Sequence, residues 1–236
     1  MIMQNDTAPY PKFDHDEHAR SCAPDDFLGQ TRRTVQGKPV SDEQIGMIIK
    51  NITARLGIKS DDTLLELACG NGALSRFLFE SCQDYVGVDL SEYLISVAKQ
   101  HFERLPHYQF TMKGAAEYVR QELHPERFSK VLCYASFCYF PAADAAEVLR
   151  TLFNRFTNVQ TVLIGNLPDK ARAKEFYKNR EPSEAELLDS STAIGTWRTR
   201  EEFAKLAAEA GWIADFSTMP SEFFASYYRY DVLLTR

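Results

Sequence analysis

The sequence predicts an α/β fold in which a mostly parallel, seven-stranded sheet carries helices on both faces. Three observations lead to this prediction. Apolar segments typical of buried strands alternate with segments of helical periodicity, which implies right-handed βαβ crossovers. A glycine-containing turn follows the first of these strands, at 68–72. Two strand-like segments, 212–219 and 227–235, follow the last predicted helix and predict a C-terminal antiparallel strand pair.

Length, composition and net charge narrow the class of protein to which this chain can belong. A chain of 236 residues with 44% hydrophobic residues suits one α/β domain with a sizeable core. The net charge of −6 argues against a nucleic-acid or anionic-membrane partner, since both favour a basic face. Residues 1–11 lack the apolar core of a signal peptide, and no C-x-x-C pair occurs among the five cysteines. We therefore expect a cytoplasmic protein without a membrane span; a homodimer is compatible with the sequence.

The elements follow in chain order. Residues 1–40 are polar and irregular, and we expect a lid or an arm that docks on the main domain, 41–236. Ser41 begins the first helix of that domain, and Gly57 ends it. The next strands are predicted at 63–67, 85–89, 108–112, 131–134 and 161–165, with helices at 73–80, 92–104, 118–123 and 142–156. A last helix begins at Thr199 and is closed by Gly211.

The segment 168–195 interrupts the alternation of strands and helices. It is charged and predicts helical pieces at 170–179 and 183–188. Because it follows the fifth strand, it would cover the carboxyl edge of the sheet, where ligands bind in open α/β folds. We interpret it as an insertion that shapes a substrate pocket.

A nucleotide-like ligand is indicated by two neighbouring segments. The first is the strand, turn and helix start around Glu66-Leu67-Ala68-Cys69-Gly70-Asn71-Gly72, where glycines let the backbone approach a ligand. The second is Asp89, which ends the next strand about 20 residues later, where an acceptor for ribose hydroxyls is expected. Gly70-x-Gly72 is also a near miss to the dinucleotide fingerprint, so an NAD-dependent oxidoreductase stays open as an alternative.

The order of these parts resembles a class I S-adenosylmethionine-dependent methyltransferase of the small-molecule type, with its Rossmann-like sheet. In the family's acid–apolar–Gly–x–Gly–x–Gly motif, Ala68 stands in place of the first glycine, a mild departure if Ala68 keeps φ below zero. Asp89 matches the second motif. The third reads Gly114-Ala115-Ala116 and lacks the acid that would bind the adenine amine. That departure also motivates a second alternative, a non-catalytic cofactor-binding protein.

The resemblance implies a function and a set of site residues. It implies in-line displacement of a methyl group from S-adenosyl-L-methionine to a hydroxyl or amine of a small molecule, such as a sugar or specialised metabolite, leaving S-adenosyl-L-homocysteine. The expected cofactor-binding residues are Glu66, Ala68, Gly70, Asn71, Gly72, Asp89, Leu90, Ser91, Ala115, Ala116 and Tyr134. The expected substrate contacts are Ser136, Tyr139, Tyr228 and Arg229, and the candidate catalytic residues are Tyr139 and His18.

The N-terminal segment supplies further candidates. Gln30, Arg32 and Arg33 would close over the cofactor, and His15 and His18 would reach the site only if this segment folds over it. The run 14–18 combines carboxylates and imidazoles, which suit several divalent ions, but a solvated polar segment is the better interpretation. We expect no metal.

Overall fold

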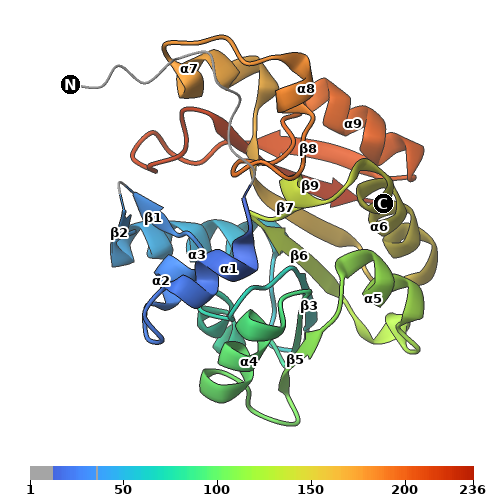
Figure 1. Cartoon of the computed structure of the whole chain (residues 1–236). Helices are drawn as coiled ribbons and strands as arrows, with labels where there is room; N and C mark the ends of the chain where they lie inside the picture. Colours follow the sequence, from blue (N-terminus) through green and yellow to red (C-terminus); the bar gives the residue numbers. More distant parts are fainter. Residues whose placement is uncertain (1–12, 36) are drawn as a thin grey trace.

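The computed structural model describes residues 13–35 and 37–236, and a seven-stranded sheet forms its centre (Figure 1). The order across the sheet is β5-β4-β3-β6-β7-β9-β8. Its strands are β3 (Thr63–Leu67), β4 (Asp84–Asp89), β5 (Tyr108–Met112), β6 (Lys130–Tyr134), β7 (Thr161–Pro168), β8 (Ile213–Ser217) and β9 (Arg229–Thr235). The first five are parallel, whereas β9 runs antiparallel to both β7 and β8. The predicted fold class and its C-terminal antiparallel pair are confirmed.

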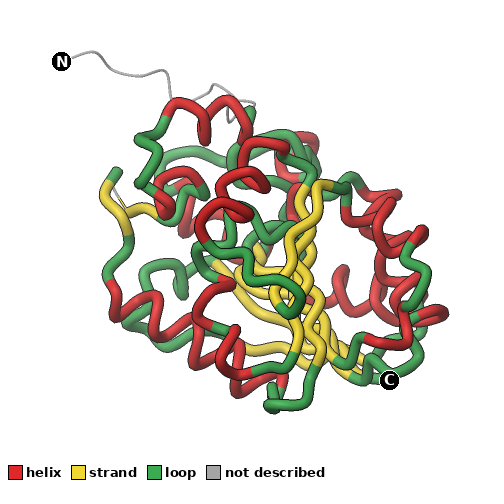
Figure 2. The backbone as a smooth tube through the Cα atoms, turned by 90° about the horizontal axis from the view of Figure 1, so that it is seen from below, coloured by secondary structure: helices red, strands yellow, loops and turns green. Residues whose placement is uncertain are grey.

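Helices cover both faces of this sheet (Figure 2). Buried residues of α3 (Asp42–Leu56) and α4 (Glu92–His101) share one core with Leu64 of β3. Those of α5 (Ala115–Gln121), α6 (Ala142–Arg155) and α9 (Arg200–Glu209) share the other with Leu65 and Leu67. Successive strand residues point to opposite faces, so one apolar strand supplies both cores.

The predicted helix ends match the structure where local chemistry determines them. The Ser41 hydroxyl accepts a hydrogen bond from the Gln44 amide and caps α3, which ends at Gly57 in the left-handed conformation (φ 58°). Thr199 and Glu202 form a reciprocal capping box at the start of α9. These caps confirm the predicted starts of both helices.

The prediction of a helix at 73–80 is wrong. The chain forms two 3-10 turns there, η1 (Ser75–Phe77) and η2 (Phe79–Ser81). The Asn71 side chain accepts a hydrogen bond from the Ala73 amide, and the Ser75 hydroxyl donates to Glu66 instead of staying free at the helix surface. Such side-chain bonds compete with regular helix formation. The segment after β7 contains η5 (Lys170–Arg172), α7 (Ala173–Tyr177) and α8 (Glu184–Leu187), shorter than the expected helices.

The N-terminal region is more regular than expected. It holds α1 (His15–Ser21), α2 (Phe27–Gln30) and the strand pair β1 (Thr34–Val35) and β2 (Lys38–Pro39). Asp14 and Asp26 cap the two helices through their side chains, a signal that the composition of the segment concealed. The inference about a signal peptide at 1–11 concerns residues outside the described ones. Within the described chain, no helix has the length and apolar character needed to cross a membrane.

Candidate functional site

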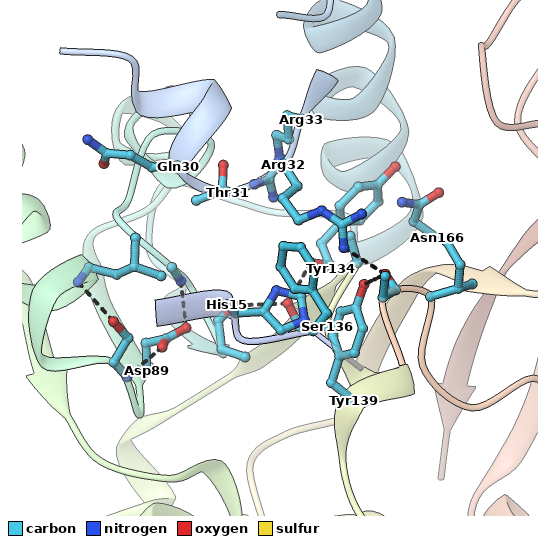
Figure 3. A pocket seen from close by; sticks show the side chains of 18 of the residues that line it. His15, Gln30, Thr31, Arg32, Arg33, Asp89, Tyr134, Ser136, Tyr139 and Asn166 are labelled. Atoms are coloured by element: carbon cyan, nitrogen blue, oxygen red, sulfur yellow. Dashed lines mark hydrogen bonds between the residues drawn. The ribbon is translucent and has the colours of Figure 1, made fainter. Parts of the chain in front are cut away.

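A cavity of about 870 Å³ opens at the carboxyl ends of β3, β4, β6 and β7 (Figure 3). The chain order of the sheet reverses between β3 and β6, and ligands of open α/β folds bind at such a switch point. The cavity wall comes from the turn after β3, the ends of the other three strands, the N-terminal region and the segment after β7. Parts of the chain far apart in sequence therefore enclose one space.

The turn after β3 has the open backbone that the motif predicts, but Ala68 does not keep the negative φ under which its replacement of glycine would be a mild departure. Ala68 has a φ of 56°, in the left-handed region that the usual glycine would adopt without strain. Gly70 and Gly72 also have positive φ, of 61° and 75°. Ala68 and Gly70 line the cavity, whereas Gly72 lies behind it against Phe110.

Backbone strain concentrates around this cavity. Five described non-glycine residues have positive φ, and four of them line it: Arg32, Ala68, Ala135 and Asn166. Conformations of this kind cost on the order of 1–3 kcal/mol each and persist where surrounding structure enforces them, commonly at ligand sites. The strain is an independent reason to place the functional site here.

Asp89 ends β4 at the cavity wall and organises the backbone around it. Its two carboxylate oxygens accept hydrogen bonds of 2.9 Å from the Gly70 and Ser91 amides. Burial raises its pKa, while these backbone donors oppose the rise. A carboxylate oxygen has more than one acceptor site, so Asp89 keeps capacity for further donors. Leu90 also lines the cavity and leaves an apolar side chain 77% exposed.

Two predicted cofactor residues serve the loop itself. Glu66 is buried, and its Oε2 accepts hydrogen bonds from Ser75 (2.6 Å) and Tyr85 (2.7 Å). The Asn71 side chain, also buried, donates to the Phe27 carbonyl and the Gln30 side chain, both at 2.9 Å. Neither residue lines the cavity. Glu66 thus connects the residues after the loop to β4, and Asn71 connects the loop to α2.

The N-terminal region and the segment after β7 meet over the cavity. The Phe13 amide donates to the Ser191 carbonyl (3.0 Å), and Arg32 Nη1 donates to the Ala193 carbonyl (2.7 Å). The Arg32 guanidinium also lies 4.0 Å from the centre of the Phe13 ring. Gln30, Arg32 and Arg33 all line the cavity, where the sequence placed them. The two segments form a joined roof.

His15, and not His18, faces the cavity. The His15 ring lies 4.4 Å from the Tyr139 ring, centre to centre, and its buried Nε2 atom has no hydrogen-bond partner among the described residues. His18 Nε2 is instead 3.0 Å from the Gly29 carbonyl, and His18 does not line the cavity. This geometry argues against the catalytic role expected for His18. Among the described residues, no group of His, Cys, Asp or Glu is arranged to hold a metal ion.

We expect acidic pH to weaken the docking of the N-terminal region on the rest of the domain. Burial, aided by the nearby Arg32 and His18 charges, lowers the pKa of His15 from 6.5 to about 4, against the opposing effect of Asp14. A released histidine binds its proton near pH 6.5, so docking is fully favoured above that pH and weakens as the pH falls toward 4. We expect hydrogen exchange in α1, corrected for intrinsic rates, to be faster at pH 5 than at pH 7.5. The variant His15→Phe keeps an aromatic ring beside Tyr139 and should lose this pH dependence; an unchanged dependence would contradict the role of His15.

The predicted substrate residues all belong to the cavity wall, and Figure 3 shows Tyr139 on the side opposite Asp89. They are Ser136, Tyr139, Tyr228 and Arg229, and Tyr134 lines the cavity as well. The Tyr139 hydroxyl donates to the Ala193 carbonyl (3.0 Å), and burial raises its pKa, so Tyr139 remains protonated at neutral pH. Ala115 and Ala116 pack against the core that contains Leu65 and Leu67, and they do not line the cavity. The third motif of the family therefore does not contribute to the cavity wall through these two residues.

Some lining residues escaped sequence reasoning. Asn166 follows the buried part of β7, at the same edge as Asp89 and Tyr134, and strand order could have indicated it. Phe223 and Phe224 precede β9 and carry no motif that marks them. They become lining residues only through the path of the chain between β8 and β9.

The fold is the Rossmann-like fold of class I S-adenosylmethionine-dependent methyltransferases, with a cavity at the switch point of the sheet. Residues 64–157 match the family model described as "Methyltransferase domain". The matched part spans β3 to α6 and therefore includes the glycine turn, Asp89 and the end of β6.

Two curated relatives are uncharacterized methyltransferases of Schizosaccharomyces pombe. One is 38% identical over 53 residues, which are 22% of this chain and 20% of the relative. The other is 29% identical over 103 residues, 40% of this chain and 34% of the relative. The similarity thus spans about a third or less of the length of either relative.

Solved structures share the fold at low identity. The cyclopropane synthase MmaA2 from Mycobacterium tuberculosis is 14% identical with a TM-score of 0.68, covering 96% of this chain and 99% of that one. The small RNA methyltransferase HEN1 is 18% identical with a TM-score of 0.61, covering 84% and 26%. Magnesium protoporphyrin IX methyltransferase from Synechocystis PCC 6803, solved with bound SAH, is 14% identical with a TM-score of 0.58, covering 82% of both chains. These neighbours differ in what their names say they act on.

Proposed function

We propose that this protein transfers a methyl group from S-adenosyl-L-methionine to a hydroxyl or amine of a small molecule. The observation that carries the proposal is the roofed cavity, which joins a cofactor wall around Asp89 to a separate polar end around Tyr139. Its volume lies within the roughly 300–1,000 Å³ that small-molecule sites occupy. The net charge of −6 and the joined roof both disfavour a nucleic-acid duplex as acceptor.

The residues of the cofactor wall fit S-adenosylmethionine. Asp89 would accept hydrogen bonds from the ribose hydroxyls, the backbone at Ala68 and Gly70 would lie against the methionine part, and Leu90 would pack on the adenine. The Leu90 side chain, otherwise exposed, would lose its contact with water there. When bound, the cofactor supplies a methyl group already activated by its sulfonium.

The remaining work of the protein is to align the acceptor and exclude water. Alignment of reacting groups contributes several kcal/mol through effective molarity. Tyr139, fixed by its bond to the Ala193 carbonyl, and Ser136, whose hydroxyl donates to the Ala68 carbonyl (3.3 Å), would shape the space between cofactor and acceptor. The segments 13–34 and 190–194 would keep water out, as a lid does.

His15 is the better candidate to receive the acceptor's proton. Its unpartnered Nε2 is available as an acceptor, and its lowered pKa keeps the ring neutral at physiological pH. Tyr139 would not act as a base, because burial keeps its hydroxyl protonated. An acceptor amine would need only to arrive neutral, whereas a hydroxyl would need this proton acceptor.

The proposal is tested by methyl transfer itself. The purified protein is incubated with methyl-labelled S-adenosylmethionine and either a small-metabolite extract or total RNA. We expect label in the small-metabolite fraction, and much less of it at limiting S-adenosylmethionine when Asp89→Ala replaces the wild type. Label confined to RNA would overturn the small-molecule assignment, and label in neither fraction would count against methyl transfer.

A further inference from the structure

Two arginines approach the buried Tyr134 hydroxyl from different parts of the fold. Arg33 precedes β1, and Arg229 begins β9. Burial raises the pKa of Tyr134, the Asp231 carboxylate raises it further, and the charges of Arg33 and Arg229 oppose this rise. Burial also raises the pKa of Glu66, which supports the glycine turn, and the Arg33 charge is among the effects that oppose this rise, so Arg33 lies on the proposed cofactor side of the cavity. Arg229 lies beside Tyr228 and Asn166, on the side of the predicted substrate contacts.

Arg229 forms no salt bridge among the described residues, because the neighbouring Asp231 carboxylate accepts its hydrogen bonds from Asn51 and from the Asn166 amide instead. Its Nη1 donates to the Asn166 carbonyl, and its guanidinium carbon lies 4.8 Å from the centre of the Tyr228 ring. The groups that act on it electrostatically are Tyr228, Tyr139 and Cys138, which are phenols and a thiol. Burial raises the pKa of Tyr139 and of Cys138, so both are neutral at pH 7. A buried cation that no carboxylate contacts is costly unless a ligand supplies the negative charge.

Two further residues of this part of the cavity wall carry buried polar atoms without a partner. The Tyr134 hydroxyl and Asn166 Oδ1 are both buried without a hydrogen-bond partner in the described structure. Tyr134 is held with its ring against Gly165, where even a Cβ would come within 2.4 Å of the ring. Asn166 is held at a positive φ of 60°, and its backbone amide donates a hydrogen bond to the Asp231 carboxylate (2.6 Å). The fold therefore fixes these unsatisfied groups at the cavity, which Figure 3 shows around Tyr134 and Asn166.

The chemistry that satisfies this set is an anionic oxygen group beside a hydrogen-bond donor. A guanidinium and a phenol both donate to carboxylate or phosphate oxygens, and the planar fork of arginine matches either group. Asn166 Oδ1 would accept from a neighbouring hydroxyl or amine of the same molecule. We propose that Arg229 and Tyr134 form an anion-binding subsite that holds a carboxylate or phosphate of the methyl acceptor, with Asn166 bonding an adjacent hydroxyl or amine. This inference rests on the proposed function and narrows its substrate class to small anionic molecules.

Calorimetric titration tests the subsite. The protein is first titrated with S-adenosylhomocysteine, which checks the cofactor side by itself. Inorganic phosphate and benzoate are then titrated separately into the saturated complex. The carboxylate of bound S-adenosylhomocysteine already occupies its own binding groups there, so the added anions do not compete with it. We expect one anion to bind per chain, and the tighter of the two probes identifies the group that the subsite selects.

Variants decide where the anion binds. Arg229→Gln should weaken anion binding by at least about tenfold and Tyr134→Phe by a few-fold, because each removes a donor to a charged group. Arg76→Gln is the matched control, since it removes the same charge from an exposed arginine outside the cavity and should change nothing. Arg229→Gln and Arg76→Gln should both bind S-adenosylhomocysteine within about twofold of wild type.

The outcomes separate the two proposals. Equal anion affinity in wild type and both cavity variants, or no anion binding at all, would overturn the subsite even if S-adenosylhomocysteine binds. Failure of S-adenosylhomocysteine to bind would count against the proposed function, and the same anion titrations on the free protein would still decide the subsite. If Arg229→Gln does not fold, Tyr134→Phe, which removes one oxygen atom, decides alone.

Discussion

Replacing Asp89 by alanine should weaken binding of S-adenosylhomocysteine by about 10- to 150-fold. Loss of a charge-assisted hydrogen-bond acceptor costs roughly 1.5–3 kcal/mol, and each 1.4 kcal/mol corresponds to a factor of ten in Kd. The backbone contributes in the same direction. The Gly70 and Ser91 amides lose the acceptors that now fix the glycine turn and the start of α4 relative to each other. Calorimetric titration of both proteins measures the change.

A second acidic residue provides the control for Asp89. Glu92 lies three residues later, in the first turn of α4, and its side chain is exposed. Glu92→Ala removes the same charge without touching the cavity and should leave the affinity within about twofold. Unchanged affinity in Asp89→Ala, with its unfolding temperature near that of wild type, would show that the cofactor does not bind at this wall.

Replacing Gly72 by valine should lower the free energy of unfolding by about 2–6 kcal/mol. Two penalties add. A β-branched residue at φ 75° carries strain on the order of 1–3 kcal/mol. A Cβ at this position would also lie 2.8 Å from the ring of Phe110, which is buried, and overpacking costs typically 1–3 kcal/mol more. Since domains of this kind are stable by only about 5–15 kcal/mol, denaturant unfolding should show a large shift of the midpoint.

Gly46 is the matched glycine for this comparison. It lies exposed inside α3, and no heavy atom lies within 4 Å of where its Cβ would be. Gly46→Ala should stabilise the protein by about 0.5–1 kcal/mol, because alanine has the higher helix propensity. If both substitutions had similar small effects, the account of the glycine turn as a conformationally required feature would be wrong.

The sheet could be predicted because its signals are local. The apolar segments of β3 to β7 and the terminal strand pair each stand out along the chain, and capping residues such as Ser41 and Thr199 mark where helices begin. The helix expected at 73–80 failed because the bonds that break it involve Glu66 and Asn71. No periodicity in 73–80 reports those partners.

Part of the candidate site was predictable in the same way, including the substrate candidates Ser136, Tyr139, Tyr228 and Arg229, which all line the cavity, whereas other parts were not. Asp89, Gly70 and Ala68 occupy the cavity where the motif placed them, yet the left-handed φ of Ala68 is a property of the turn and not of alanine. The choice between His15 and His18 depends on which face of α1 meets Tyr139. Asn166 becomes part of the site through the order of strands across the sheet.

The most direct test of the central claim is calorimetric titration of the purified protein with S-adenosylhomocysteine, with NAD as a parallel control. The structure predicts binding of one S-adenosylhomocysteine per chain in the micromolar range and no binding of NAD. Binding of NAD alone would identify a dinucleotide enzyme and contradict the assignment of the cavity. Binding of neither would show that the glycine turn and Asp89 do not form a cofactor site.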